Sequence, residues 1–260
     1  MTNSQRDFKT SGKITLIAWS ILIVIPAVLY AFSVQLFPRI ELDTLFAEAW
    51  FWITSSGTVP YGIITGLILL IACYYTLTRQ QFIPLILTVS LSMAATLSLN
   101  HFLKPFFSEP RPYAVLMQQE NLLNLNDFYQ ADNAVKKDKI TTSLNLLATA
   151  RADLVLSPAI KKHWQYEVGY SFPSGHTLFA VTLALSMGFY LLMAGQTLFP
   201  LMLFSWAIFM GFSRMLLGMH WPQDVLASTC IGGMISFASI YLIHKLSPTI
   251  AVLQKLSATK

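Results

Sequence analysis

The sequence predicts an all-α, polytopic membrane protein with six transmembrane helices and a small helical cap outside the bilayer. Of its 260 residues, 55% are hydrophobic and 11% are charged, whereas soluble proteins carry about 25% charged residues. The mean hydropathy is +0.57. Several separate windows are apolar and long enough to cross a hydrocarbon core, which needs about 20 helical residues. We expect a single membrane-embedded domain over residues 1–260.

The expected spans are separated by short connections, apart from one long polar insertion. The first window follows Arg6, Lys9 and Lys13 and resembles a secretory signal, but it is too long and has no Ala-x-Ala cleavage site. We interpret it as a retained span. The six windows are residues 14–37, 59–77, 82–103, 174–194, 198–217 and 224–246.

Two further segments are expected outside the hydrocarbon core. Residues 41–53 place apolar and aromatic side chains at helical spacing, which is typical of an amphipathic helix at the membrane interface. Residues 113–172 mix apolar patches with charged side chains, and are too polar to span a membrane and too apolar to be disordered. We expect this second segment to form a periplasmic cap of small helices.

The charges flanking the spans predict the topology. Lys and Arg near the N-terminus, with Arg79 and Lys245, favour a cytoplasmic location for both termini. Residues 38–58 hold three carboxylates and one arginine, and so face outward. The net charge of +5 comes with no basic stripe interleaved with aromatics, so we expect no nucleic-acid partner.

Three polar islands occur at the outward ends of the expected spans. Ionisable groups beside a membrane cost free energy, so their recurrence indicates a function. A phosphate group needs several cations and directed N–H donors. Lys104 alone would be interpreted as an interfacial anchor. Together with Arg111 and the other islands, it is expected to contact phosphate. The islands are Lys104-x6-Arg111-Pro112, Pro173-Ser174-Gly175-His176 and Ser213-Arg214-x5-His220-x3-Asp224.

The second island has the pattern of a helix start. Ser174 is a natural N-cap, and Gly175 allows a ligand to approach the backbone closely. The N-terminus of a helix attracts anions. His176 would lie in the first turn, where it could act as a general acid. The ordinary alternative is a helix cap followed by a chance histidine.

The third island combines a cation, an imidazole and a carboxylate. Pro222 suits the first turn of a helix, so His220 is expected just before the sixth span and Asp224 just inside it. A carboxylate that accepts the Nδ1–H of the imidazole leaves Nε2 free to attack. A buried structural His–Asp pair is the alternative.

These islands match, in order and spacing, the three-part motif of the type 2 phosphatidic acid phosphatase superfamily, which also includes vanadium haloperoxidases and bacterial acid phosphatases. Residues 163–177 and 213–222, with Asp127-Phe128-Tyr129, resemble the bacterial phosphatidylglycerophosphatase B group. The resemblance extends over the six-span plan and is loosest in the first hundred residues and the cap.

The resemblance implies a lipid phosphatase without metal or cofactor in a bacterial inner membrane, with its site facing the periplasm. His220 would attack phosphorus, His176 would protonate the departing lipid, and Asp224 would orient His220. The implied substrates are phosphatidylglycerophosphate first, then phosphatidate, diacylglycerol diphosphate and undecaprenyl diphosphate; no obligate protein partner is evident. The residues implied to hold the phosphate oxygens are Lys104, Arg111, Ser174, Gly175 and Arg214.

Three other functions compete with this one. The enzyme could mainly recycle undecaprenyl diphosphate, because the motif reads the phosphate and not the lipid tail. A phosphate or lipid transporter would place cations near the midplane and show an inverted repeat, and neither feature is visible in the sequence. A vanadate-binding oxidase is disfavoured by the membrane spans.

Three further residues are not expected in the site. Glu167 precedes the second island and could tune a histidine or guide water, but a cap carboxylate paired with Lys161 or Lys162 explains it at least as well. His101 is expected to pack near the membrane boundary, and His163 to be a cap residue.

The expected site supplies cations where a metal site would need more carboxylates. We therefore expect EDTA to leave the hydrolysis of lipid phosphates almost unchanged in detergent. Strong inhibition that a divalent ion restores would overturn this expectation.

Overall fold

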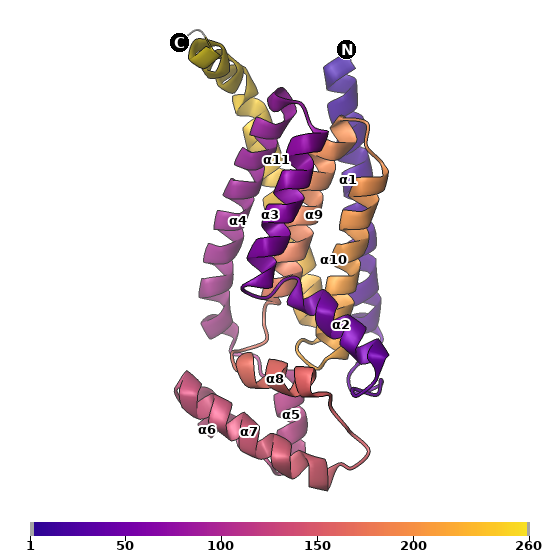
Figure 1. Cartoon of the computed structure of the whole chain (residues 1–260), viewed down its shortest axis with the longest axis vertical. Coiled ribbons are helices and arrows are strands. Elements are labelled where there is room, and N and C mark those ends of the chain that lie inside the picture. The colour runs from indigo at the N-terminus through magenta and orange to yellow at the C-terminus, as the bar shows by residue number, and fades with distance from the viewer. Residues whose placement is uncertain (1–2, 259–260) are drawn as a thin grey trace.

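Long helices run side by side in a bundle, and shorter helices gather at one end of it in the computed structural model, which describes residues 3–258 (Figure 1). The described residues contain no strand, only an isolated bridge between Leu42 and Leu156. The all-α prediction is confirmed. The bundle helices are α1 (Asn3–Ala31), α3 (Tyr61–Thr76), α4 (Arg79–Phe107), α9 (Gly175–Met193), α10 (Leu198–Leu216) and α11 (Pro222–Ala258). The others are α2 (Leu45–Ser55), α5 (Pro112–Gln119), α6 (Leu125–Gln130), α7 (Asn133–Ala150) and α8 (Pro158–Tyr166).

Five of the bundle helices are long and apolar enough to cross a membrane, namely α1, α4, α9, α10 and α11. Helix α3 is apolar but has only 16 residues, so the sixth span stays a prediction. The predicted windows 174–194 and 198–217 agree with α9 and α10 to within one residue at each end. Helix α4 is longer than its window at both ends, and α11 extends beyond residue 246.

The first window is predicted to reach residue 37, and this boundary is wrong. Helix α1 ends at Ala31, followed by Ser33 with a φ of 53° and a bond from the Val34 amide to the Leu29 carbonyl. The apolar residues after this turn are used in tertiary packing. The ring of Phe37 is buried and contacts Trp164 of α8 edge to face, with 5.8 Å between centroids.

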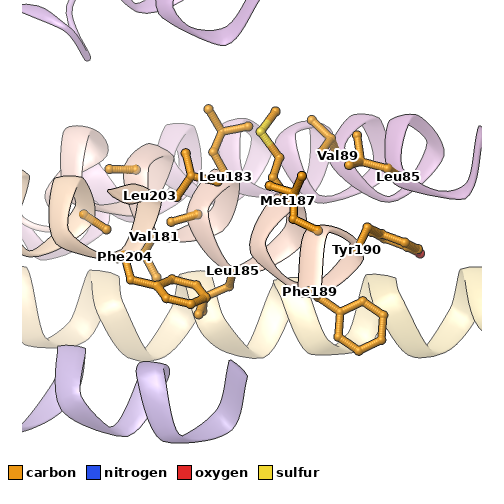
Figure 2. Packing of buried hydrophobic residues seen from close by; sticks show 14 of the residues in the cluster. Leu85, Val89, Val181, Leu183, Leu185, Met187, Phe189, Tyr190, Leu203 and Phe204 are labelled. Atoms are coloured by element: carbon orange, nitrogen blue, oxygen red, sulfur yellow. The ribbon is translucent and has the colours of Figure 1, made fainter. Parts of the chain in front are cut away.

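Helix α9 is the central element of the bundle, because α1, α4, α10 and α11 all pack against it. Its side chains from Thr177 to Leu191 are buried on nearly every face. A helix that is apolar on all sides must be enclosed by others. In Figure 2, Leu183 and Met187 of α9 point toward Leu85 and Val89 of α4.

Hydroxyl groups connect α4 to α9 across the bundle. Three side chains of α4 spaced four residues apart, and therefore on one face, meet polar partners on α9. The pairs are Thr88–Tyr190 at 2.8 Å, Ser92–Ser186 at 3.4 Å and Thr96–Thr182 at 3.4 Å. We call these three pairs the hydroxyl seam. Asn100 and Lys104 continue the same spacing toward the end of α4, so the seam fixes the register of α4 against the start of α9.

The predicted interfacial helix corresponds to α2, which packs on α10 and α8. Its Leu45 and Trp52 side chains are 86% and 63% exposed, as expected for a helix that meets lipid or an interface on one side. Residues 113–172 fold mainly into α5 to α8, which lie beyond the ends of α4, α9 and α10 (Figure 1). Their location outside a bilayer remains a prediction.

A second hydrophobic cluster joins these short helices to the bundle. The indole of Trp164 in α8 is fully buried, stacks on Tyr113 of α5 and donates to the Leu217 carbonyl at the end of α10. Leu217 and Met219 belong to the same cluster. The loop between α10 and α11 is therefore held from the side of α5 and α8 as well as from the bundle.

The hydroxyl seam predicts energetic coupling between Thr88 and Tyr190. Either single change, Thr88→Val or Tyr190→Phe, should lower the free energy of unfolding in detergent, because each leaves a buried hydroxyl without its partner. A double-mutant cycle should give a coupling of about 0.5–1.5 kcal/mol. As a control, Thr76→Val removes a hydroxyl that bonds only within α3, and it should be additive with Tyr190→Phe. Equal coupling energies in the Thr88–Tyr190 and Thr76–Tyr190 cycles would show that the Thr88–Tyr190 hydrogen bond does not contribute to stability.

Candidate functional site

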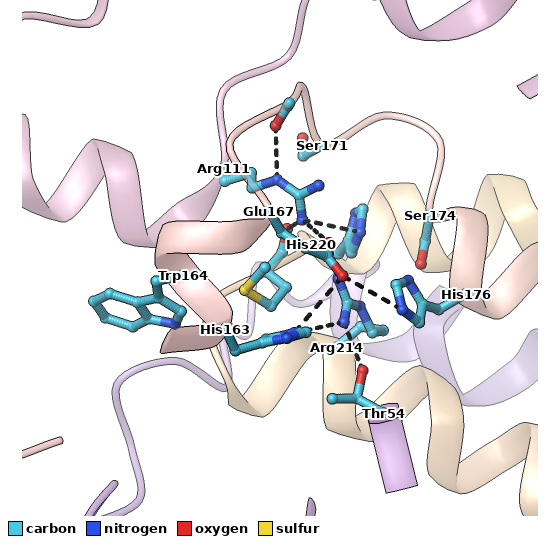
Figure 3. Close-up of polar contacts among 12 residues, drawn as sticks. Thr54, Arg111, His163, Trp164, Glu167, Ser171, Ser174, His176, Arg214 and His220 are labelled. Atoms are coloured by element: carbon cyan, nitrogen blue, oxygen red, sulfur yellow. Dashed lines mark hydrogen bonds and ion pairs between the residues drawn. The ribbon is translucent and has the colours of Figure 1, made fainter. Parts of the chain in front are cut away.

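The three polar islands meet at the end of the bundle that faces α8 (Figure 3). Arg111 is the N-cap of α5, and His176 lies in the first turn of α9. Arg214 lies in the last turn of α10, and the loop that follows carries His220. Asp224 lies in the first turn of α11. Helix ends thus bring together side chains that are more than a hundred residues apart in the sequence.

Arg214 is completely buried and is held by Thr54 of α2, His163 of α8 and Glu167, the C-cap of α8. Its Nη2 lies 2.7 Å from Oε2 of Glu167, and its Nη1 lies 3.0 Å from Nε2 of His163. Nη1 also donates to the hydroxyl of Thr54 in α2. A buried guanidinium requires such partners, because an unpaired charge in the interior costs several kcal/mol.

Arg111 joins the first island to the third. Its Nε donates to the Gly169 carbonyl at 2.7 Å, and its Nη1 donates to the Met219 carbonyl at 3.3 Å. The same Nη1 is 3.1 Å from Oε2 of Glu167 and 3.5 Å from Nε2 of His220. The backbone amide of Arg111 donates to the Tyr129 hydroxyl. Together these contacts fix the orientation of the guanidinium, which faces Glu167 and His220.

His220 has the geometry expected of an oriented imidazole. Its Nδ1 lies 3.3 Å from Oδ2 of Asp224, which also accepts the Trp221 amide at 2.9 Å. Its Nε2 faces Arg111. Burial, followed by the charges of Arg111 and Arg214, holds the pKa of His220 well below its usual value. The ring is therefore neutral near pH 7, with a lone pair available on one nitrogen.

His176 lies on the other side of the arginine pair. Its Nε2 is 2.8 Å from the hydroxyl of Thr58 and 3.4 Å from Oε1 of Glu167. Figure 3 shows its ring directed at the same space as Arg214 and Glu167. The carboxylate of Glu167 contacts His176 and both guanidiniums at once.

The remaining expected residues lie around this centre. Ser174 caps α9 through the Thr177 amide, and its hydroxyl is 2.9 Å from that of Thr177. The atoms nearest to a Cβ on Gly175 would be those of the Asn100 side-chain amide, at 3.4 Å or more. Lys104, in the last turn of α4, donates to the Tyr170 carbonyl at 2.8 Å. Of these three expected residues, Lys104 is the cation at the rim of the site.

Glu167 belongs to this cluster, and its expected pairing with Lys161 or Lys162 is wrong. Its carboxylate binds Arg111 and Arg214 instead. Burial alone would raise the pKa of Glu167, but the charges of Arg214, His176 and Arg111 outweigh it and hold the pKa well below its usual value. The side chain is therefore an anion in the centre of the site.

His163 is expected to be an ordinary cap residue, whereas in the structure it contacts Arg214 directly. Burial lowers the pKa of His163 to about 4, so its neutral ring accepts the guanidinium N–H. His101, by contrast, is exposed on α4, next to Phe102. The spacing of His163 and Glu167 by one helical turn is the only sequence signal for their shared location.

Thr54 and Thr58 are further site residues that the sequence did not indicate, since hydroxyls in an apolar segment give no pattern. The arginines and imidazoles suit an anion. Across the described residues, no group of three or more His, Cys, Asp or Glu side chains is arranged to hold a metal ion.

Comparison with known proteins extends this picture. A family model described as the PAP2 superfamily matches residues 85–248, a range that includes every expected site residue. Phosphatidylglycerophosphatase B of Haemophilus influenzae is 30% identical over 223 residues, which cover 83% of this chain and 89% of that protein. Phosphatidylglycerophosphatase B of Escherichia coli is 29% identical over 202 residues, covering 76% and 77%. A shorter match links the chain to the undecaprenyl-diphosphatase of Sulfolobus acidocaldarius, with 37% identity over 73 residues, or 28% of this chain and 34% of that protein.

The turn between Arg214 and His220 depends on Gly218. This residue has a φ of +70°, and a Cβ would lie 2.9 Å from the ring of Phe37. We expect Gly218→Ala to reduce the rate of phosphate release by roughly tenfold or more, because it displaces the His220 loop. Gly195→Ala is the matched control, with a φ of +77° and open space around its Cβ position. Equal rates in the two variants would contradict this expectation.

Proposed function

Since the chain belongs to the PAP2 superfamily and is a phosphatase, we propose that it hydrolyses the membrane lipid phosphatidylglycerophosphate to phosphatidylglycerol and phosphate. The observation that carries this proposal is the convergence of two imidazoles and two arginines on one buried position. The two relatives named phosphatidylglycerophosphatase B, each matched over most of their length, favour this lipid.

In the proposed first step, Nε2 of His220 attacks phosphorus while the bond from phosphorus to the lipid oxygen breaks. Asp224 supports the attack, because its carboxylate accepts the Nδ1–H and leaves the lone pair on Nε2. Burial keeps this imidazole neutral and therefore nucleophilic. The products of the step are a phosphohistidine and the lipid alcohol, whose oxygen receives its proton from His176.

His176, in its protonated form, gives this proton to the leaving oxygen as the bond to phosphorus breaks. Thr58 and Glu167 both contact Nε2 of His176, so this nitrogen is directed into the site. In the second step, His176 takes a proton from water as the water oxygen attacks phosphorus. The P–N bond then breaks, which releases inorganic phosphate and restores both histidines.

The phosphate oxygens carry negative charge throughout, and the cations of the site stabilise it. Arg111 comes from the start of α5 and Arg214 from the end of α10. Each guanidinium can bind the phosphate oxygens through two N–H groups. Lys104 adds a cation at the rim, on the side of Tyr170. The start of α9, with Ser174 and Gly175, supplies backbone N–H groups to the same anion.

Undecaprenyl diphosphate is the second candidate substrate. The match to an undecaprenyl-diphosphatase supports it, although that match is confined to 73 residues. The same cations and imidazoles serve a diphosphate, because the chemistry occurs at the terminal phosphorus.

The proposed setting is a bacterial inner membrane crossed six times, with α3 as the additional span. Helix α1 begins and α11 ends at the same end of the bundle, as an even number of crossings requires (Figure 1). The charge pattern supports a cytoplasmic location for both termini and a periplasmic location for the site, with α5 to α8 as its cap. Residues 1–260 form a single domain in this proposal, supported by the hydrophobic cluster that α5 and α8 share with Leu217 and Met219.

Phosphate release from a panel of lipid phosphates tests the function. We expect the purified protein in detergent to hydrolyse phosphatidylglycerophosphate with the highest kcat/KM, ahead of undecaprenyl diphosphate, phosphatidate and diacylglycerol diphosphate. His220→Ala should abolish release from all of them, since no other group supplies the nucleophile.

The matched control is His101→Ala, which removes an exposed imidazole of α4. It should leave the rates unchanged. Normal turnover in His220→Ala would show that His220 is not the nucleophile. A higher kcat/KM for undecaprenyl diphosphate would favour the second candidate substrate.

A further inference from the structure

The position between the two arginines and His176 is already occupied by the carboxylate of Glu167. Its Oε2 lies 2.7 Å from Arg214 and 3.1 Å from Arg111. Its Oε1 lies 3.4 Å from Nε2 of His176 and has no hydrogen-bond partner. In Figure 3 the carboxylate lies at the centre of the cluster, with Arg111 on one side and Arg214 and His176 on the other.

These contacts are the ones that a phosphate group would make there. A phosphate monoester would place equatorial oxygens on the guanidiniums and its leaving oxygen near His176. Glu167 presents one oxygen to the guanidiniums and the other to the imidazole. The side chain therefore matches a bound phosphate in the sign of its charge and in its contacts.

A carboxylate and a phosphate cannot both occupy this position. The phosphate brings about two negative charges, and like charges within hydrogen-bonding reach repel strongly in a buried site. Without any anion, however, Arg214 would be a fully buried charge facing only neutral partners, which costs several kcal/mol. The empty site needs an internal anion that the filled site must exclude.

Building on the phosphatase function above, we propose that Glu167 is an internal competing anion, which holds the phosphate position until the substrate displaces its side chain from Arg111 and Arg214. The same competition then helps to expel inorganic phosphate after hydrolysis. The lipid substrate can offset the competition through its tails, whereas free phosphate cannot.

In this proposal the side chain of Glu167 moves while its backbone stays in place. The backbone of Glu167 is fixed, because its amide donates to the His163 carbonyl at 3.0 Å and its carbonyl accepts the Tyr113 hydroxyl at 3.1 Å. Gly169, two residues further on, is exposed, and apart from its chain neighbours no atom lies within 4 Å of where a Cβ would be. The Glu167 side chain is itself 12% exposed, and it lies at the start of the loop that leads to α9.

Titration with inorganic phosphate tests the proposal without relying on turnover. The thermal midpoint of the full-length protein in detergent is measured against phosphate concentration for wild type and Glu167→Gln. Without phosphate, the variant should be less stable than wild type, because the arginines lose their counter-charge. Its half-saturating phosphate concentration should be lower by about tenfold or more, since the competing charge is gone. Inhibition of hydrolysis by phosphate should become stronger in parallel.

Glu120→Gln is the matched control, because it removes a carboxylate that pairs with Arg151 in the same group of short helices. It should leave the phosphate response unchanged. If Glu167→Gln does not fold, Glu167→Asp replaces it; the shorter side chain holds the arginines less well, so it should also bind phosphate more tightly than wild type.

Phosphate binding that is unchanged or weaker in the Glu167 variants would overturn the proposal. This outcome is distinct from failure of the proposed function, which would appear as wild-type protein that hydrolyses no lipid phosphate. The thermal titration reports on anion competition in either case.

Discussion

Two buried guanidiniums can lie close together in this protein because a carboxylate lies between them. Arg111 and Arg214 come from the ends of α5 and α10, and Glu167 compensates both charges. Without this ion pair, the ends of α5 and α10 would repel each other in a region of low dielectric constant. The positions of His220 and His176 depend on the same contact, since each ring borders one of the arginines or the carboxylate.

Contacts from both the bundle and the short helices stabilise the position of this ion pair. On the bundle side, the hydroxyl seam sets the register of α4 and α9, so that Lys104 and His176 arrive at the same level. On the other side, Trp164 fixes α8 to the end of α10 and thereby brings Glu167 to Arg214. The site is a junction between two packed clusters, which explains why most of its charged groups are buried.

Local signals made much of the fold and part of the site predictable. The fourth and fifth spans could be predicted from the length of their apolar windows alone. Ser174 marks the start of α9 as an N-cap, and Pro222 marks the start of α11 through its fixed φ. Glu167 and His163 could not be assigned in this way, because their partners are set by how α8 packs on α10. The end of α1 was mispredicted for a similar reason: hydrophobicity does not distinguish a span from the apolar residues that follow it, of which Phe37 is buried by tertiary contact with Trp164.

The hydroxyl seam also links the site to the thickness of its surroundings. Helices adapt to a thinner or thicker hydrocarbon layer by tilting, at a small cost per ångström of mismatch. Polar pairs at three levels resist any slide of α4 along α9. A change in acyl-chain length should therefore change the tilt of helices outside this contact, such as α3. The spacing between Lys104 and the start of α9 should stay constant. The rigid pair of helices thus keeps the spacing of these side chains the same in membranes of different lipid composition.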